Sequence, residues 1–416
     1  MTDIDTPYNR LRRATDYFML GGLIAVSGFP FFMTAQINFF ILFLIVSIIY
    51  LRRSIVFDGR MLSVVAFFLV VEVLQFLFIK PFDPVMISGT FIRMFLSFFV
   101  VSLTGKNFAK YFTNIVYVFS IISFFFFIPS LLSPSFFNFF VSSVCPHFDP
   151  PFADPGGFYI VWPTNIIFCF HECVLAEFRN PGPFWEPGLF AVFLNLALVF
   201  NFIETKKIWG IKNIVLTLAL VSTLSTAGYI AFFVLVFSFY LVNQSLAKKI
   251  IFSAILLPGL LTLYFSLDFL STKVEENIDL AGSTTSSRFG SALIDIEDFS
   301  KSPFIGWGRG VMRYGGRAFS FFSEDQHRNN SVTDLLATYG IFLFLFYFYN
   351  YWKSLRALCQ SSGFNAHFSY FALLVILLLG FSQSIFMKPF FYSILFLQYT
   401  YGTMREDKKE ELPVLV

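Results

Sequence analysis

A carboxylate stands among rigid turns where a long apolar stretch begins. Residues 179–191 read RNPGPFWEPGLFA, so Glu186 lies between two Pro-Gly pairs and directly before Pro187. Acids and proline both favour the first turn of a helix, and a helix start therefore accounts for part of this pattern. It does not account for Arg179 or for the paired turns. A carboxylate fixed at a membrane boundary can orient a sugar hydroxyl or accept its proton, and we predict this role for Glu186.

An arginine opens a short amphipathic segment later in the chain. Residues 287–299, SRFGSALIDIEDF, carry an apolar stripe at helical spacing. The stripe consists of Phe289, Leu293, Ile296 and Phe299. Such a helix can lie flat on a membrane surface, with Arg288 in its first turn at the height of a lipid pyrophosphate. Because a guanidinium matches phosphate oxygens, Arg288 is a candidate phosphate ligand.

The segment before a later apolar stretch holds weaker signals. Residues 302–310, SPFIGWGRG, form a Pro/Gly-rich turn, and residues 325–340, DQHRNNSVTDLLATYG, lead into the apolar stretch. His327 is the only histidine of this region and neighbours Arg328, Asn329 and Asn330. Histidine is suited to proton transfer near neutral pH. The alternative is a structural histidine in a solvated loop of mixed charge.

Two charged residues fall inside apolar stretches. Glu72 lies eight residues before Lys80, and Arg93 lies nine residues after Pro84. Both therefore sit at about the same depth on consecutive helices, which predicts a structural ion pair facing the protein interior. The alternative is a wall of a substrate cavity.

Composition shows what must position these residues. The chain has 416 residues, of which 56% are hydrophobic and 13% charged, and this balance cannot cover a soluble domain. A bilayer crossing takes about 20 apolar residues. We predict an all-α polytopic membrane protein, a single membrane domain over residues 1–416 with about twelve spans. They are residues 16–34, 36–51, 61–80, 84–104, 111–132, 186–204, 208–225, 227–244, 250–268, 333–352, 368–386 and 389–403.

Basic residues are distributed unequally between the two sides of these spans. Each of the seven polar segments on the amino-terminal side carries two or three basic residues, whereas the short turns on the other side carry only Lys80 and Lys388. The positive-inside rule therefore places both termini in the cytoplasm. Two long segments, residues 133–185 and 269–332, are then external loops. The first contains Arg179 and ends just before Glu186, and the second contains Arg288 and His327.

Several classes of protein and site are disfavoured. A net charge of +3 without a basic cluster does not indicate nucleic-acid binding. No cleavage site follows the polar start, so we expect no removable signal peptide. The four cysteines form neither a metal spacing nor a disulfide framework. Cys145, Cys169 and Cys173 nevertheless lie in or near the first external loop, where a disulfide is permitted. A bond involving Cys145 is one hypothesis, and reduced thiols are the other.

The order of these motifs resembles the O-antigen polymerase and O-antigen ligase superfamily, by motif over residues 175–345 and by topology over the whole chain. The first matching motif is the stretch of Arg179, Gly182, Phe184, Glu186, Pro187, Gly188, Phe190 and Ala191. The later ones are Arg288 in SSRFGSALI, the turn of Pro303, Gly306 and Gly308, and the span entry with Asn330, Leu336 and Gly340. Each motif is loose, and their order carries the resemblance.

Two departures favour the polymerase branch. Asn329 occupies the position of the family histidine, and His327 lies two residues early. The turn STLSTAGYI, residues 222–230, has Ala227 where a related motif has arginine. Both missing features are typical of the ligase branch.

The resemblance implies a periplasmic glycosyltransferase of the bacterial inner membrane, with a GT-C-like fold suspected. It would join undecaprenyl-pyrophosphate-linked oligosaccharide repeat units into O-antigen or a related surface polysaccharide. Arg288, Arg179, Arg328 and Asn330 would bind substrate, and Glu186, His327 and Arg288 would serve catalysis. The expected partners are the lipid-linked oligosaccharide, membrane lipid, and a chain-length regulator and flippase. No metal spacing is present, so we expect a metal-independent reaction without a cofactor.

Two rival functions differ in what they predict. A ligase would transfer the glycan to lipid A-core and make no ladder from lipid-linked repeat units alone. A transporter or flippase would show repeats between the two halves of the chain and broken helices near the midplane. The sequence shows no such repeat.

Overall fold

The computed structural model describes residues 7–34, 36–53, 55, 57–79, 84–148, 152–153, 159–160, 162–243, 288–308 and 330–402. These residues are largely helical. The first helices are α1 (Pro7–Gly28), α2 (Pro30–Thr34), α3 (Gln36–Arg52), α4 (Arg60–Ile79), α5 (Pro84–Thr104), the short turn η1 (Gly105–Asn107) and α6 (Phe108–Leu132). The later long helices are α9 (Pro187–Thr205), α10 (Ile211–Ser222), α11 (Thr226–Asn243), α14 (Arg288–Lys301), α15 (Ser331–Ser361), α16 (Phe368–Ser382) and α17 (Pro389–Tyr401).

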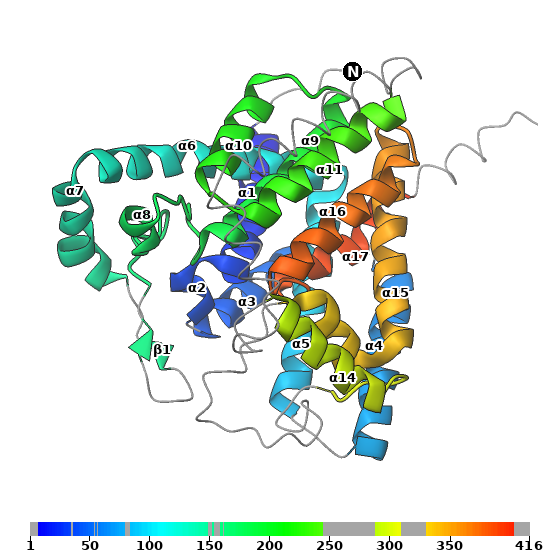
Figure 1. Cartoon of the computed structure of the whole chain (residues 1–416). Helices are drawn as coiled ribbons and strands as arrows, with labels where there is room; N and C mark the ends of the chain where they lie inside the picture. The colour runs from blue at the N-terminus through cyan, green and yellow to red at the C-terminus, as the bar shows by residue number, and fades with distance from the viewer. Residues whose placement is uncertain are drawn as a thin grey trace, which may run out of the picture.

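The first predicted loop folds into small elements beside the main bundle (Figure 1). They are α7 (Pro134–Phe139), η2 (Phe140–Val144), η3 (Cys145–His147), β1 (Phe152–Ala153), β2 (Tyr159–Ile160) and α8 (Cys173–Ala176). The two strands pair antiparallel, with Phe152 opposite Ile160. Phenylalanines from this loop pack with Phe126 of α6, so an aromatic cluster anchors the loop to the bundle.

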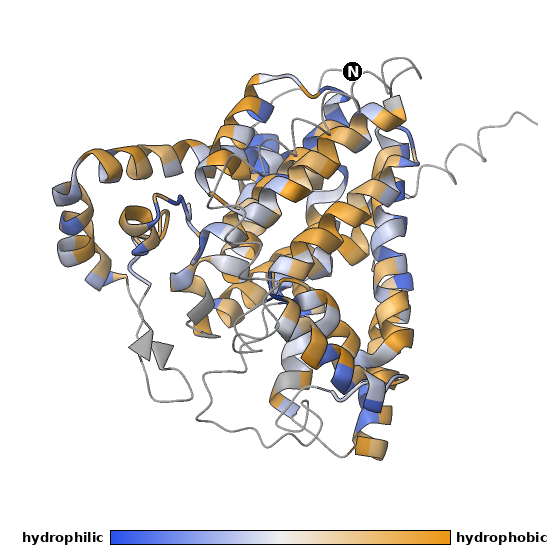
Figure 2. Cartoon of the chain, in the orientation of Figure 1, coloured by the Kyte–Doolittle hydropathy of each residue, from blue (hydrophilic) through white to orange (hydrophobic). Residues whose placement is uncertain are grey.

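Four helical stretches of the described residues are long and apolar enough to cross a membrane. They are Arg60–Ile79, Ile87–Leu132, Pro187–Thr205 and Ser331–Ser361. The helical membrane class predicted from the sequence is thereby confirmed, and apolar residues run along nearly every helix (Figure 2). Gly105, with a φ of +55°, begins the turn that divides the second stretch into α5 and α6.

Most of the predicted spans coincide with helices, but one helix is shorter than the span predicted for it. Eleven of the twelve ranges coincide with helices, whereas residues 250–268 lie outside the described part of the chain. The range 208–225 was predicted too long, because α10 has 12 residues and extends only about 18 Å. A hydrocarbon core is about 30 Å thick, so α10 by itself is shorter than a full crossing.

Buried helices at the centre bring distant parts of the chain together. Almost every residue of α9 and α17 is buried. The backbone N–H of Phe390, in the first turn of α17, donates to Ser27 Oγ of α1 at 2.8 Å. A Cβ added to Gly28 would lie 2.5 Å from the Phe184 ring. The carboxyl end of α1 therefore meets the entries of both α9 and α17.

The hypothesis of a disulfide at Cys145 is wrong. All four cysteines of the chain lie in the described residues, and each is a buried thiol outside any disulfide. Cys145 belongs to the aromatic cluster of the first loop, with Phe137, Phe168 and Phe170. Burial raises the pKa of the Cys173 thiol to about 12, which leaves little of the thiolate that disulfide exchange requires.

Candidate functional site

The loop before α9 is fixed by one asparagine. Asn180 Nδ2 donates to Ser123 Oγ and to Ser222 Oγ, each at 3.0 Å, and its Oδ1 accepts from Gly182 N–H at 3.0 Å. Gly182 has a φ of +56°, and an added Cβ would lie 2.8 Å from the Phe190 ring. Only glycine fits both constraints. The loop is thus tied to α6, α10 and α9 before it reaches Glu186.

Glu186 is the N-cap of α9, but its side chain does not cap the helix. Its backbone is extended, with φ −148° and ψ 153°, and Pro187 takes the first helical position. The residue therefore has the structural place that the sequence suggested, while its carboxylate is left for other contacts. The side chain is half-buried.

The turn between α16 and α17 lies directly against this helix start. An added Cβ at Gly188 would come within 2.3 Å of Gln383 Nε2. Lys388 Nζ lies 4.1 Å from the centre of the Trp185 ring, close enough for a cation–π contact. Lys388 thus stands next to the residue that precedes Glu186.

Helix α14 brings Arg288 to the same place. The Phe289 ring contacts the Phe381 ring at the end of α16, 5.2 Å between centroids. Farther along α14, Asp295 accepts a hydrogen bond from Thr333 Oγ1 of α15 at 2.7 Å. Arg288 opens the helix, as the sequence predicted, and is half-buried.

The apolar stripe of α14 faces outward. Its residues Phe289, Leu293 and Ile296 are 43%, 51% and 48% exposed, while the opposite face is buried against α15. An exposed apolar stripe on a short helix is what a helix lying in a membrane interface presents to lipid.

The glycine turn after α14 locks this helix onto a break in α15. Gly340 interrupts α15 with φ 71° and ψ 179°. The backbone N–H groups of Trp307 and Gly308 donate to the carbonyls of Ala337 and Thr338. Gln75 Nε2 of α4 donates to the same Thr338 carbonyl at 2.8 Å. These contacts fix the turn, and with it the end of α14, against the break in α15.

At the end of the bundle where α9 and α17 begin, four cationic side chains and one carboxylate are close enough to interact electrostatically. Burial lowers the pKa of the Arg288 guanidinium, the Glu186 charge raises it, and Arg179 lowers it further. Burial lowers the pKa of the Lys388 ammonium to about 8, Arg93 lowers it further, and Glu186 opposes both. All five side chains are half-buried. We refer to Arg93, Arg179, Glu186, Arg288 and Lys388 as the cationic site.

Arg179 of the cationic site is held at two points. Its Nε donates to the Thr223 carbonyl at 3.1 Å, and its Nη1 pairs with Glu177 at 2.9 Å. Thr223 belongs to the turn of residues 222–230, which also carries Ala227. The guanidinium of Arg179, from the loop before α9, therefore contacts this turn.

The remaining predicted residues have different outcomes. His327 and Arg328 lie outside the described residues. Asn330 is fully buried as the N-cap of α15, where its Oδ1 accepts from Val332 N–H and Thr333 N–H. Its Oδ1 is thus engaged in capping, which leaves only its amide nitrogen for the predicted substrate contact.

The predicted pairing of Glu72 with Arg93 stays a prediction. Glu72 is buried in α4, and α4 contacts α5, which carries Arg93. Ser97, one turn after Arg93, donates to the Pro389 carbonyl at 2.5 Å. Arg93 therefore lies beside the α17 entry as well, which the sequence reading did not predict.

Lys388 is the functional candidate that sequence reasoning missed. In the sequence, Lys388 is one of two basic residues in the short turns that we predict to be external. Basic residues are uncommon on that side of a membrane protein, and this exception to the positive-inside rule was the signal that could have identified Lys388. Across the described residues, no group of three or more His, Cys, Asp or Glu side chains is placed to hold a metal ion.

No protein-family model matches the chain, and no curated protein matches it either.

Proposed function

We propose that this protein polymerises oligosaccharide repeat units carried on undecaprenyl pyrophosphate, by glycosyl transfer at the periplasmic face of a bacterial inner membrane. One observation carries the proposal. Separate elements of an apolar helical bundle bring Arg179, Arg288 and Lys388 together around Glu186. A site rich in cations, next to an outward-facing apolar helix, suits a ligand with a polyanionic head and a lipid tail.

The residues have distinct roles in the proposed transfer. A hydroxyl of the acceptor sugar attacks the anomeric carbon of the donor, and its proton passes to Glu186. The bond from that carbon to the pyrophosphate oxygen breaks, and the leaving group departs with the electron pair. Arg288 and Lys388 stabilise the negative charge that develops on it, while the firmly held Arg179 acts as a second clamp.

The fold is consistent with the orientation that this reaction requires. Helix α1 has 22 residues and extends about 33 Å, close to the thickness of a hydrocarbon core. Its carboxyl end lies at the cationic site, and its basic amino end lies at the opposite end. We infer about twelve spans, cytoplasmic termini and a GT-C-like arrangement. A flippase and a chain-length regulator are the expected protein partners.

The test is polymer formation by purified protein supplied only with lipid-linked repeat units. A polymerase yields a ladder, whereas a ligase yields no product without lipid A-core. The variant Arg288→Ala should lose about 10²–10³-fold in rate, the loss typical of removing one transition-state donor. Arg288→Lys should recover little, because it restores the charge without the two-pronged geometry.

Lys301→Ala is the matched control, since Lys301 lies on the same helix and forms an exposed ion pair with Glu297. It should polymerise normally. A ladder of normal rate from Arg288→Ala would overturn the assignment of Arg288. The absence of any ladder from well-folded wild-type protein would overturn the polymerase itself.

A further inference from the structure

A charged cavity lies at the end of α1 opposite the cationic site. It measures about 500 Å³ and is formed by the amino-terminal part of α1, the end of α5, η1 and the start of α6. Its lining includes Asn9, Arg12, Arg13, Asp16, Lys106 and Tyr111. We call it the α1–η1 pocket. None of its residues belongs to the cationic site.

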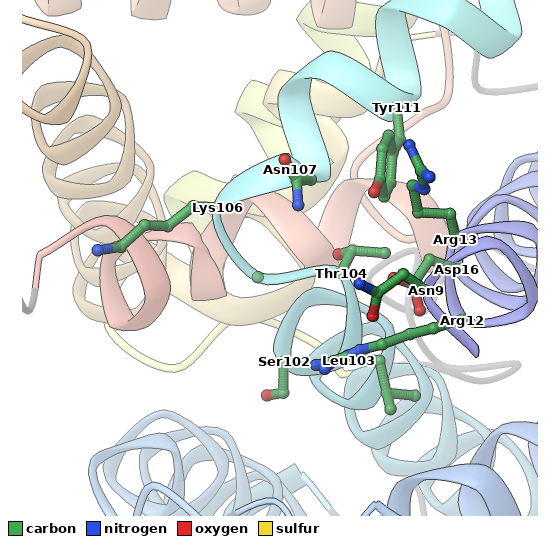
Figure 3. Close-up of a pocket in the computed structure, with 11 residues that line it drawn as sticks. Asn9, Arg12, Arg13, Asp16, Ser102, Leu103, Thr104, Lys106, Asn107 and Tyr111 are labelled. Atoms are coloured by element: carbon green, nitrogen blue, oxygen red, sulfur yellow. The ribbon is translucent and has the colours of Figure 1, made fainter. Parts of the chain in front are cut away.

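The charges of the α1–η1 pocket are predominantly positive. The lining carries three basic side chains and one acidic one. The acidic one, Asp16, already accepts a hydrogen bond from Arg53 Nη1 at 2.5 Å, and Arg53 does not line the pocket. Figure 3 shows Arg13 alongside the Tyr111 ring and Arg12 extending toward Ser102, with Lys106 pointing away from both. Two guanidinium groups therefore face the pocket from one turn of α1.

A less polar cavity adjoins the pocket. It measures about 460 Å³ and shares Ser102 with the α1–η1 pocket. Its walls include Ile55, Phe57, Phe98 and Tyr399, and they also carry Asp58 and Arg60, which form an ion pair with each other. A charged compartment next to one with several apolar and aromatic walls matches an amphiphile better than a small soluble anion.

We propose that the α1–η1 pocket binds the phosphate of an anionic phospholipid, whose acyl part lies toward the adjoining aromatic cavity. Arg12 and Arg13 hold the phosphate oxygens. Basic pockets between helices on the cytoplasmic side of membrane proteins are suited to anionic headgroups. The basic segments predict that this end of α1 faces the cytoplasm, where such lipids are abundant. This inference does not depend on the reaction carried out at the cationic site.

The experiment measures lipid binding to the full chain in detergent by native mass spectrometry. The probes are dioleoyl phosphatidylglycerol and dioleoyl phosphatidylcholine. We expect the anionic lipid to bind about tenfold or more tightly than the zwitterionic one. The double variant Arg12→Gln/Arg13→Gln should lose this preference. Arg12→Lys/Arg13→Lys should keep most of it, because the charge remains.

The matched control is Lys206→Gln/Lys207→Gln, which removes two adjacent, exposed cations outside both pockets. It should leave the lipid preference unchanged. If the Arg12/Arg13 double variant does not accumulate, Arg12→Gln alone should still reduce the preference, by about fivefold.

Three results would overturn the proposal. The first is an unchanged preference in the glutamine variants. The second is equal loss in the Lys206/Lys207 control. The third is competition by soluble glycerol phosphate at the concentration of the lipid, which would make the ligand a free phosphate compound.

Discussion

At the scale of single residues, Lys388 changes the chemistry that the site can perform. A guanidinium stays charged at every physiological pH, whereas an ammonium with a lowered pKa does not. Burial lowers the pKa of Lys388 to about 8, and Arg93 acts in the same direction. Its charge near the Trp185 ring therefore changes with pH around 8.

The proposed polymerisation should fall as pH rises through about 8, because Lys388 then loses the positive charge on which its proposed role at the leaving group depends. Well above that pH, the part of the rate that depends on this charge should fall about tenfold per unit. Lys388→Arg should move the fall to higher pH, and Lys301→Arg should not. Initial rates from pH 6.5 to 9.5 measure this, and identical profiles for wild type and Lys388→Arg would contradict it.

Stability should change with pH in the opposite direction. The folded-state pKa of Lys388, about 8, lies below the ordinary value of 10.5. Between these two values the unfolded chain binds more protons than the folded one, so the contribution of this residue to stability rises with pH. A loss of activity above pH 8 is therefore expected without a loss of fold.

At the scale of elements, the position of α14, and so of Arg288, depends on a close backbone contact between the turn after α14 and α15. The turn after α14 crosses α15 where Gly340 breaks the helix, and an added Cβ there would lie 2.3 Å from the Phe304 carbonyl oxygen. No side chain can be accommodated against a backbone atom at this distance. The conformation, with φ +71°, is also one that only glycine adopts without strain.

Gly340→Ala should lower the free energy of unfolding by about 3 kcal/mol or more, from left-handed backbone strain and overpacking together. Titration of the purified protein with sodium dodecyl sulfate measures this. The control Gly89→Ala, where an added Cβ meets nothing within 4 Å, should have little effect. Equal stability of the two variants would show that the crossing of turn and helix is not tight.

At the scale of the whole molecule, both ends of the bundle carry a cluster of basic side chains, and we propose a different ligand for each. Helix α1 connects them, with the α1–η1 pocket at its amino end and the cationic site at its carboxyl end. The lipid proposed for the first lies in the cytoplasmic leaflet and the substrate proposed for the second lies on the periplasmic side, so both proposals require the same orientation in the membrane.

Reporter fusions test this orientation directly. Alkaline phosphatase fused after residues 150 and 300 should be active, and after residues 55, 208 and 358 inactive, because the enzyme folds only outside the cytoplasm. Green fluorescent protein at the same sites should give the complementary pattern. Phosphatase that is inactive after residue 300 would place Arg288 in the cytoplasm and remove the basis of the proposed reaction.

The sequence by itself determined the features that depend on local pattern. Apolar blocks and their flanking polar residues located eleven helices, because a helix in lipid must satisfy its backbone internally and cover itself with apolar side chains. The same local logic located α14, its first-turn Arg288, and the Glu186–Pro187 entry to α9. Each of these assignments requires only residues within a few turns of one another.

The tertiary structure decided what depends on residues far apart in the chain. Lys388 and Arg93 join Glu186 only because α17 packs against α1 and α5, and no local pattern encodes that packing. The capping role of Asn330 also required the fold, and so did the burial of the cysteines among aromatic rings. Helix formation is governed by short-range periodicity, whereas a site made from four elements is governed by side-chain packing between them.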